Sequence, residues 1–162
     1  MGSVNQAVIA FDPGVKGGVA KIAPDYYQVF ALNGKPDHDI ACVRELFEPG
    51  DMVVIEDVHS IFGMSAKSHF GFGKSVGFLN GVIWSLGATS IRLIPPKVWQ
   101  KAIGVTGIKE SKDRKQALID KALELFPGVD LKATPRCTTP HSGCADALLI
   151  AYVCTHFLKD HG

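Results

Sequence analysis

Gln6–Gly14 reads QAVIAFDPG, and this stretch decides the fold of the chain. Five apolar residues in a row precede Asp12, and Pro13 and Gly14 follow it. A continuous apolar run bounded by Pro and Gly is typical of a central strand that is buried on both faces. We therefore expect a buried strand that delivers the carboxylate of Asp12 to a turn.

Two further segments place an acid at the end of an apolar element. Met52–Asp57 (MVVIED) repeats the strand pattern and ends its apolar run on Glu56. Cys144–Tyr152 (CADALLIAY) predicts a helix that is apolar on nearly every side, with Asp146 in its first turn, where the helix dipole favours negative charge. Helix capping alone would account for Asp146. Three acids at the ends of buried strands and helices favour a metal site, because clustered carboxylates repel one another and need a cation.

The surrounding pattern predicts one α/β domain over residues 1–162, with a mixed five-stranded sheet flanked by helices. A chain that is 46% hydrophobic supports a single sizeable core. The first three strands are separated by short gaps and should form an antiparallel meander, whereas the last two alternate with helices and should be parallel additions. Asp12 and Glu56 would then lie side by side at one edge of the sheet. The predicted strands are 6–12, 17–23, 26–32, 52–57 and 90–94, and the predicted helices are 38–48, 68–86, 96–103, 111–126 and 143–158.

Several protein classes are disfavoured. The sequence has no run of about 18 apolar residues and no charged segment before an apolar one, so we expect no membrane span and no signal peptide. The four cysteines contain no CxxC pair, which fits reduced thiols inside a cell. A zinc site at Cys137, His141 and Cys144 lacks a nearby fourth ligand and is the less favoured interpretation.

The charge distribution is uneven although the net charge is only +1. Between Lys97 and Lys115 the sequence places six cations against two acids. A solvated helix face is the ordinary explanation. Beside an acidic metal site, the same stretch suits a polyanion that is cut by metal ions, with the metal at the scissile phosphate and lysines on its neighbours.

Five short motifs follow one another along the chain: FDPG at 11–14, IEDV at 55–58, PKVWQKAIG at 96–104, SKD at 111–113 and ADALLIA at 145–151. In this order they resemble the motif series of RuvC-type Holliday junction resolvases, and they are more similar to the phage-encoded and organellar branches. The resemblance implies a ribonuclease H-like fold, a homodimer and two Mg²⁺ or Mn²⁺ ions per active site. It also implies paired nicks in a four-way DNA junction that leave a 5′-phosphate and a 3′-hydroxyl. The expected location is the cytoplasm of a bacterium or phage-infected host, with an organelle as the alternative.

The resemblance assigns metal-binding roles residue by residue. Asp12 would bridge two metal ions, and Glu56 and Asp146 would each hold one. The pattern also calls for Asp or His one turn before Asp146, where this chain has Gly143. His141 is the nearest candidate for this ligand or for a proton carrier. In the alternative it is an exposed loop histidine, and water or the neighbouring serine completes the shell.

The resemblance also implies a set of DNA contacts. Lys112 matches a family lysine that contacts the scissile phosphate and would be catalytic. Trp99 fills another lysine column, as a core residue or as a base-stacking platform. Phe62 is favoured over His59 as the aromatic that probes the junction, and the spacing of Gly77 and Gly81 would allow close helix packing between two subunits. The expected DNA-binding residues are Phe62, Lys67, Lys74, Lys97, Lys101, Lys112 and Lys115.

Other functions remain open. The DPGxxGG pattern at 12–18 also resembles the phosphate loop of actin-like sugar kinases and ATPases, but those enzymes clamp nucleotide between two such domains. We therefore expect no nucleotide cofactor. A nuclease of the same fold could act instead on RNA–DNA hybrids or other branched DNA, and a chain without the fourth ligand could be a catalytically inactive junction-binding module.

Overall fold

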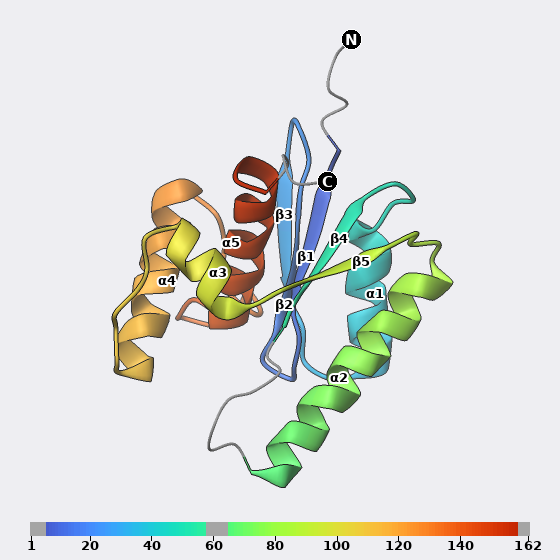
Figure 1. Cartoon of the computed structure of the whole chain (residues 1–162), viewed down its shortest axis with the longest axis horizontal. Coiled ribbons are helices and arrows are strands. Elements are labelled where there is room, and N and C mark those ends of the chain that lie inside the picture. The colour runs from blue at the N-terminus through green and yellow to red at the C-terminus, as the bar shows by residue number, and fades with distance from the viewer. Residues whose placement is uncertain (1–5, 58–64, 159–162) are drawn as a thin grey trace.

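The protein is described by a computed structural model over residues 6–57 and 65–158. Five strands and five helices make up this part of the chain (Figure 1). The strands are β1 (Val8–Asp12), β2 (Gly18–Ile22), β3 (Tyr27–Ala31), β4 (Met52–Glu56) and β5 (Ile91–Ile94). The helices are α1 (Pro36–Leu46), α2 (Ala66–Ser85), α3 (Pro96–Ala102), α4 (Ser111–Leu125) and α5 (Ser142–His156).

The strands form one mixed sheet in the order β3-β2-β1-β4-β5. β1 pairs antiparallel with β2, which pairs antiparallel with β3, whereas β4 pairs parallel with β1 and β5 parallel with β4. The predicted meander and the two parallel additions are therefore confirmed. Because β1 and β4 run in the same direction and Phe11 lies opposite Ile55, both strands end at the same edge of the sheet.

Helices cover both faces of the sheet (Figure 1). Alternate residues of β1 point to opposite faces, so Ile9 and Phe11 pack in the core under α1 and α2, while Val8 and Ala10 pack in the core under α5. All four side chains are fully buried. The continuous apolar run of β1 thus reflects its central place in a sheet that is covered on both sides.

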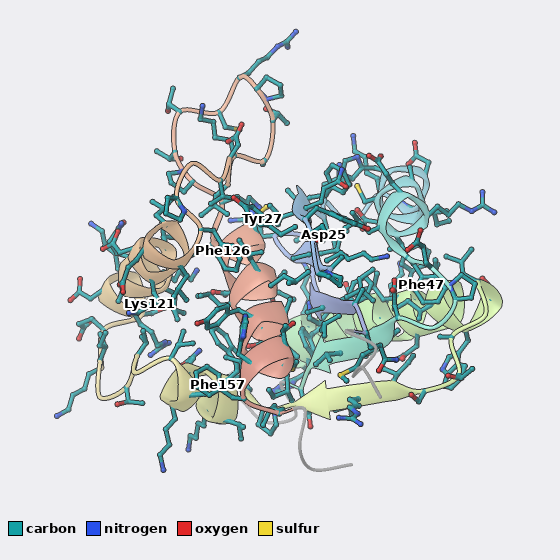
Figure 2. The ribbon with its side chains drawn as sticks, turned by 90° about the horizontal axis from the view of Figure 1, so that it is seen from above. Asp25, Tyr27, Phe47, Lys121, Phe126 and Phe157 are labelled. Carbon is teal, nitrogen blue, oxygen red and sulfur yellow. The ribbon has the colours of Figure 1, made fainter. Side chains whose placement is uncertain are left out.

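α5 is the innermost helix of its layer, and most of its residues are buried. It packs on β1 and β2, and α4 lies against its outer side. At the end of α4, the ring of Phe126 contacts Tyr27 of β3 edge to face, with centroids 4.9 Å apart (Figure 2). This packing explains why α5 shows almost no polar face in the sequence.

Three helices begin earlier than predicted, α1 and α2 by two residues each and α5 by one. α1 begins at Pro36, because proline suits the first helical position, where its missing N–H has no partner to lose. The buried carboxylate of Asp39 accepts hydrogen bonds from the backbone N–H groups of Asn33 and Gly34, which fixes the preceding turn. α5 begins at Ser142, so Asp146 lies in the second turn of the helix. The prediction that placed it in the first turn was wrong, because the helix starts one residue earlier than expected.

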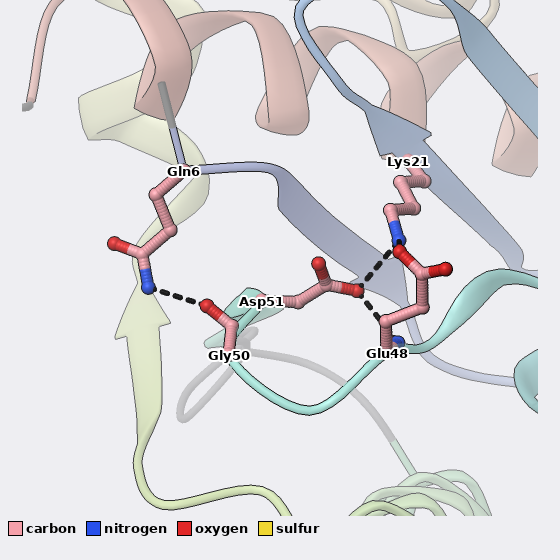
Figure 3. A network of polar contacts seen from close by, with 5 residues as sticks. All are labelled: Gln6, Lys21, Glu48, Gly50 and Asp51. Carbon is pink, nitrogen blue, oxygen red and sulfur yellow. Dashed lines mark hydrogen bonds and ion pairs between the residues drawn. The ribbon is translucent and has the colours of Figure 1, made fainter. Parts of the chain in front are cut away.

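A buried lysine ties the loop before β4 to the sheet (Figure 3). The side chain of Lys21 on β2 is 1% exposed, and its Nζ lies 2.8 Å from Glu48 Oε2 and 2.9 Å from Asp51 Oδ2. Asp51 Oδ2 also accepts a hydrogen bond from the backbone N–H of Glu48, and Gln6 Nε2 donates to the carbonyl of Gly50. These contacts fix the start of β4, the strand that carries Glu56.

Candidate active site

Three carboxylates meet where β1, β4 and α5 come together. Asp12 is the last residue of β1, and Glu56 is the last residue of the neighbouring parallel strand β4. α5 packs across β1 and β2 and brings Asp146 to the same edge of the sheet. The edge at the carboxyl ends of parallel strands is where α/β proteins usually place their ligands.

The pKa values of these groups show that they interact. Burial raises the pKa of Asp12 well above its usual value, and the nearby Glu56 and Asp146 raise it further. Burial and Glu56 raise the pKa of Asp146 to about 7. The pKa of Glu56 is also raised, with burial as the main cause. Close approach of the Asp12 and Glu56 side chains raises the pKa of Asp12 further and offsets part of the rise at Glu56.

One oxygen of this cluster has no partner. Asp146 Oδ1 is buried without a hydrogen bond to any of the described residues. Buried polar atoms are nearly always paired, so an orphaned carboxylate oxygen beside two further carboxylates suits a cation ligand. Carboxylate oxygens are the ligands that Mg²⁺, Mn²⁺ and Ca²⁺ prefer.

Among residues 6–57 and 65–158, no group of three or more His, Cys, Asp or Glu side chains is arranged to hold a metal ion. The structure does not support the zinc alternative, because Cys144 is buried and burial raises the pKa of its thiol to about 12. A thiol that holds its proton so firmly is a poor zinc ligand.

The position expected to supply the fourth ligand cannot carry a side chain. A Cβ on Gly143 would overlap the carbonyl oxygen of Lys16 and the backbone of Gly17, and a Cβ on Gly18 would overlap the carbonyl group of Gly143. The first turn of α5 therefore touches the turn between β1 and β2 backbone to backbone. This contact gives a physical reason for the glycine at position 143.

His141, the candidate fourth ligand, precedes α5 as its N-cap residue. Its backbone N–H donates to the carbonyl of Leu131, and its Nδ1 is buried without a partner among the described residues. Burial lowers the pKa of the imidazole, and Lys16 lowers it further. Neither cause is one of the three carboxylates of the cluster.

Trp99 donates a hydrogen bond to Glu56, and this contact was not predicted from the sequence. The indole Nε1 donates a hydrogen bond of 2.9 Å to Glu56 Oε1, and the Trp99 side chain is fully buried. Of the two interpretations of Trp99, the core residue is confirmed, and a buried ring offers no face to a base. In the sequence, the lysines around Trp99 indicate a DNA contact. No spacing of residues indicates a hydrogen bond from Trp99 to Glu56, 43 positions earlier.

The lysines expected to contact DNA lie on helices, whereas the expected aromatic contact falls outside the described residues. Lys115 lowers the pKa values of Asp12 and Asp146, and Arg114 lowers that of Asp146, so α4 presents cations to the acidic cluster. Lys112 lies at the start of the same helix. Phe62 and His59 fall outside the described residues. The candidate lysines are all exposed, with Lys67 and Lys74 on α2, Lys97 and Lys101 on α3, and Lys112 and Lys115 on α4.

A hollow of about 300 Å³ adjoins the cluster on the side of α2. Glu56 forms one wall, so the hollow opens beside the carboxylates. The other lining residues are Asp57, His69, Phe72, Gly73, Val76 and Leu93.

The fold matches known structures. Over 93% of this chain and 92% of the other, it superposes on Thermus thermophilus RuvC in complex with a Holliday junction substrate, with a TM-score of 0.59 and 15% identity. A second structure of Thermus thermophilus RuvC matches with a TM-score of 0.51 and 17% identity, over 93% of each chain. No protein-family model and no curated protein matches the sequence. The ribonuclease H-like fold of RuvC is therefore confirmed for this chain.

Proposed function

We propose that this protein is a divalent-metal-dependent endonuclease that resolves four-way DNA junctions by paired nicks. The observation that carries the proposal is the cluster of Asp12, Glu56 and Asp146, with its raised pKa values and its orphaned oxygen, at one edge of the sheet. The fold supports it, because the Thermus RuvC of the same fold is in complex with a Holliday junction.

The three acids would coordinate the cations in different roles. Asp12 is the carboxylate whose pKa both other acids raise, which supports its role as the shared ligand, with Glu56 and Asp146 on either side. Two Mg²⁺ or Mn²⁺ ions would supply the positive charge and Lewis acidity that activate water and stabilise a leaving 3′ oxygen. Cleavage of the bond between phosphorus and that oxygen leaves a 5′-phosphate and a 3′-hydroxyl. His141 is the candidate for a further ligand or a proton carrier.

The exposed lysines would hold the DNA backbone around the scissile phosphate. Lys115 would offset the repulsion between the phosphate and the carboxylates, since it already lowers the pKa values of Asp12 and Asp146. Lys112, one turn earlier on α4, is the candidate contact to the scissile phosphate. The remaining candidates for DNA contact are Phe62, Lys67, Lys74, Lys97 and Lys101.

Paired nicks require two active sites, and α2 offers a surface for a homodimer. Only Leu79 and Ile83 of this 20-residue helix are buried. The opposite side of the helix carries Phe70, which is 77% exposed, and Trp84, which is 50% exposed. Between them lie the glycines at 73, 77 and 81, where an added Cβ would meet open space. Small residues flanked by large apolar ones suit close packing against a second copy of the helix.

The variant Asp12→Asn tests the proposed site. It removes one charge and keeps the side-chain shape, so we expect cleavage of a labelled synthetic junction to disappear. Binding of the junction, measured by gel shift, should be unchanged or tighter. The exposed lysines are unchanged, and one negative charge that repels the phosphate is removed.

The control is Asp25→Asn, which neutralises an exposed acid that lies between β2 and β3. It should retain full cleavage. Loss of binding together with cleavage in Asp12→Asn would count against the assigned role of Asp12.

A further inference from the structure

The hydrogen bond from Trp99 to Glu56 joins the shortest helix of the described chain to the candidate metal site. Glu56 ends β4 opposite Ile94, the last residue of β5, and the two strands continue together, since the backbone N–H of Asp57 donates to the Ile94 carbonyl. Pro95 and Pro96 then turn the chain directly into α3. This path returns Trp99 to the end of β4, where Nε1 lies 2.9 Å from Glu56 Oε1.

The chemistry of the indole suits the positioning of a ligand. An indole N–H donates and never accepts, so it fixes one oxygen of the carboxylate in one orientation. It also carries no charge. A lysine in the same place would neutralise Glu56 and compete with a cation, whereas the indole leaves the negative charge of the carboxylate available.

Burial makes this arrangement rigid. The side chain of Trp99 is fully buried in the core under α5, and Glu56 is 8% exposed. Breaking the bond would leave the buried indole N–H of Trp99 unpaired, which costs more than the bond itself contributes. The carboxylate therefore has little freedom to rotate.

We propose that Trp99 is a positioning residue that orients the Glu56 carboxylate for divalent cation binding. The inference rests on the proposed function, because it assigns Glu56 to a cation. It adds to that function a neutral donor on α3 that acts through Glu56 and touches neither DNA nor metal.

Trp99→Phe tests the role, because it removes the donor and keeps an aromatic ring in the core. We expect Mn²⁺ affinity of the DNA-free protein, measured by electron paramagnetic resonance, to fall about tenfold or more. The Mg²⁺ concentration that gives half-maximal junction cleavage should rise by a similar factor.

The matched control is Val105→Ala, which removes packing from the same core cluster and keeps the Trp99 donor to Glu56. It should lower thermal stability and leave Mn²⁺ affinity unchanged. Equal affinity losses in Trp99→Phe and Val105→Ala, or no loss in either, would overturn the role of Trp99. Wild-type protein that takes up no Mn²⁺ would instead overturn the proposed function.

Fluorescence supplies a second readout that is independent of cleavage. The chain has two tryptophans, so Trp84→Phe leaves Trp99 as the sole reporter. Its emission should change on titration with Mg²⁺, and the change should disappear when Glu56→Gln is added. A change that persists with Glu56→Gln, or the absence of any change in a protein that binds Mn²⁺, would contradict the coupling between Trp99 and the cation.

Discussion

At the scale of residues, Asp12 and Asp146 illustrate the electrostatic cost of clustering buried acids. Each carboxylate is held where burial and neighbouring acids disfavour its charge, and one oxygen of Asp146 has no partner. Such an arrangement destabilises the fold unless protons or cations neutralise it. Clusters of this kind are characteristic of functional sites, because stability alone would favour paired or exposed acids.

The close contact of Gly143 with the turn before β2 yields a prediction. Gly143→Ala should lower the free energy of unfolding by about 1–3 kcal/mol, because the added methyl group overlaps the backbone of Lys16 and Gly17 and α5 must shift. Cleavage should fall as well, since α5 carries Asp146. Urea unfolding and junction cleavage measure both effects.

Gly71→Ala is the matched control, because it makes the same substitution inside α2, where a Cβ meets open space. Its stability should be unchanged or higher by roughly 0.5–1 kcal/mol. If Gly143→Ala were as stable as Gly71→Ala, the contact between α5 and the turn would not restrict position 143.

Sequence pattern identified the acidic residues but not their surroundings. An acid that ends an apolar run is visible in the sequence, which is why Asp12 and Glu56 could be chosen and placed at one edge. The hydrogen bond from Trp99 depends on the path of the chain through β5 and α3, and the exclusion of side chains at Gly143 depends on the distance between two backbones. Neither has a periodicity that a sequence could display.

At the scale of elements, the Lys21 network holds the start of β4 against β2. Burial lowers the pKa of Lys21, but hydrogen bonds to Glu48 and Asp51 outweigh burial, so the net pKa is raised. The pKa of Glu48 is lowered by the same contact. The raised lysine contributes stability that is present at neutral pH and lost as the pH rises through its folded-state pKa, above 10.5. The lowered glutamate contributes stability that is present above 4.5 and lost as the pH falls through its folded-state pKa.

Lys21→Met should therefore destabilise the protein at neutral pH by about 3 kcal/mol, because it leaves Asp51, whose side chain is 5% exposed, without its cation. The loss of stability that the wild type shows above pH 10.5 should be smaller in the variant. Urea unfolding between pH 4 and pH 11 measures both effects.

Lys132→Met, at an exposed position, should match the wild type across this range. A Lys21→Met variant with wild-type stability at neutral pH would show that the network does not fix β4.

The arrangement of elements was largely predictable because local rules determine it. Short gaps between the first three strands left room only for antiparallel turns, and the helices between later strands allowed parallel pairing. Helix starts were less predictable. α1 begins at Pro36 and α5 begins at Ser142, because proline chemistry and backbone packing set these starts rather than apolar periodicity.

At the scale of the whole molecule, the open face of α2 predicts the assembly. Gly77→Arg places a long charged side chain in the middle of that face, where the structure has space for it in a single copy. We expect the variant to remain folded and to sediment as a monomer, whereas the wild type sediments as a dimer. Junction cleavage should then give single nicks in place of paired ones.

Thr89→Arg adds the same charge at an exposed position beyond the end of α2 and should leave the dimer intact. A Gly77→Arg protein that remains dimeric would place the subunit interface elsewhere.

The central claim is that the carboxylate cluster cuts branched DNA with the help of divalent cations. The most direct test is cleavage of a labelled four-way junction beside linear duplex, RNA–DNA hybrid and single strand, with Mg²⁺, Mn²⁺ or chelator. We predict symmetric nicks with 5′-phosphate ends in the junction alone, and only with metal. Cleavage of the hybrid would reassign the protein as a ribonuclease, and tight junction binding without cleavage under any condition would contradict catalysis at this site.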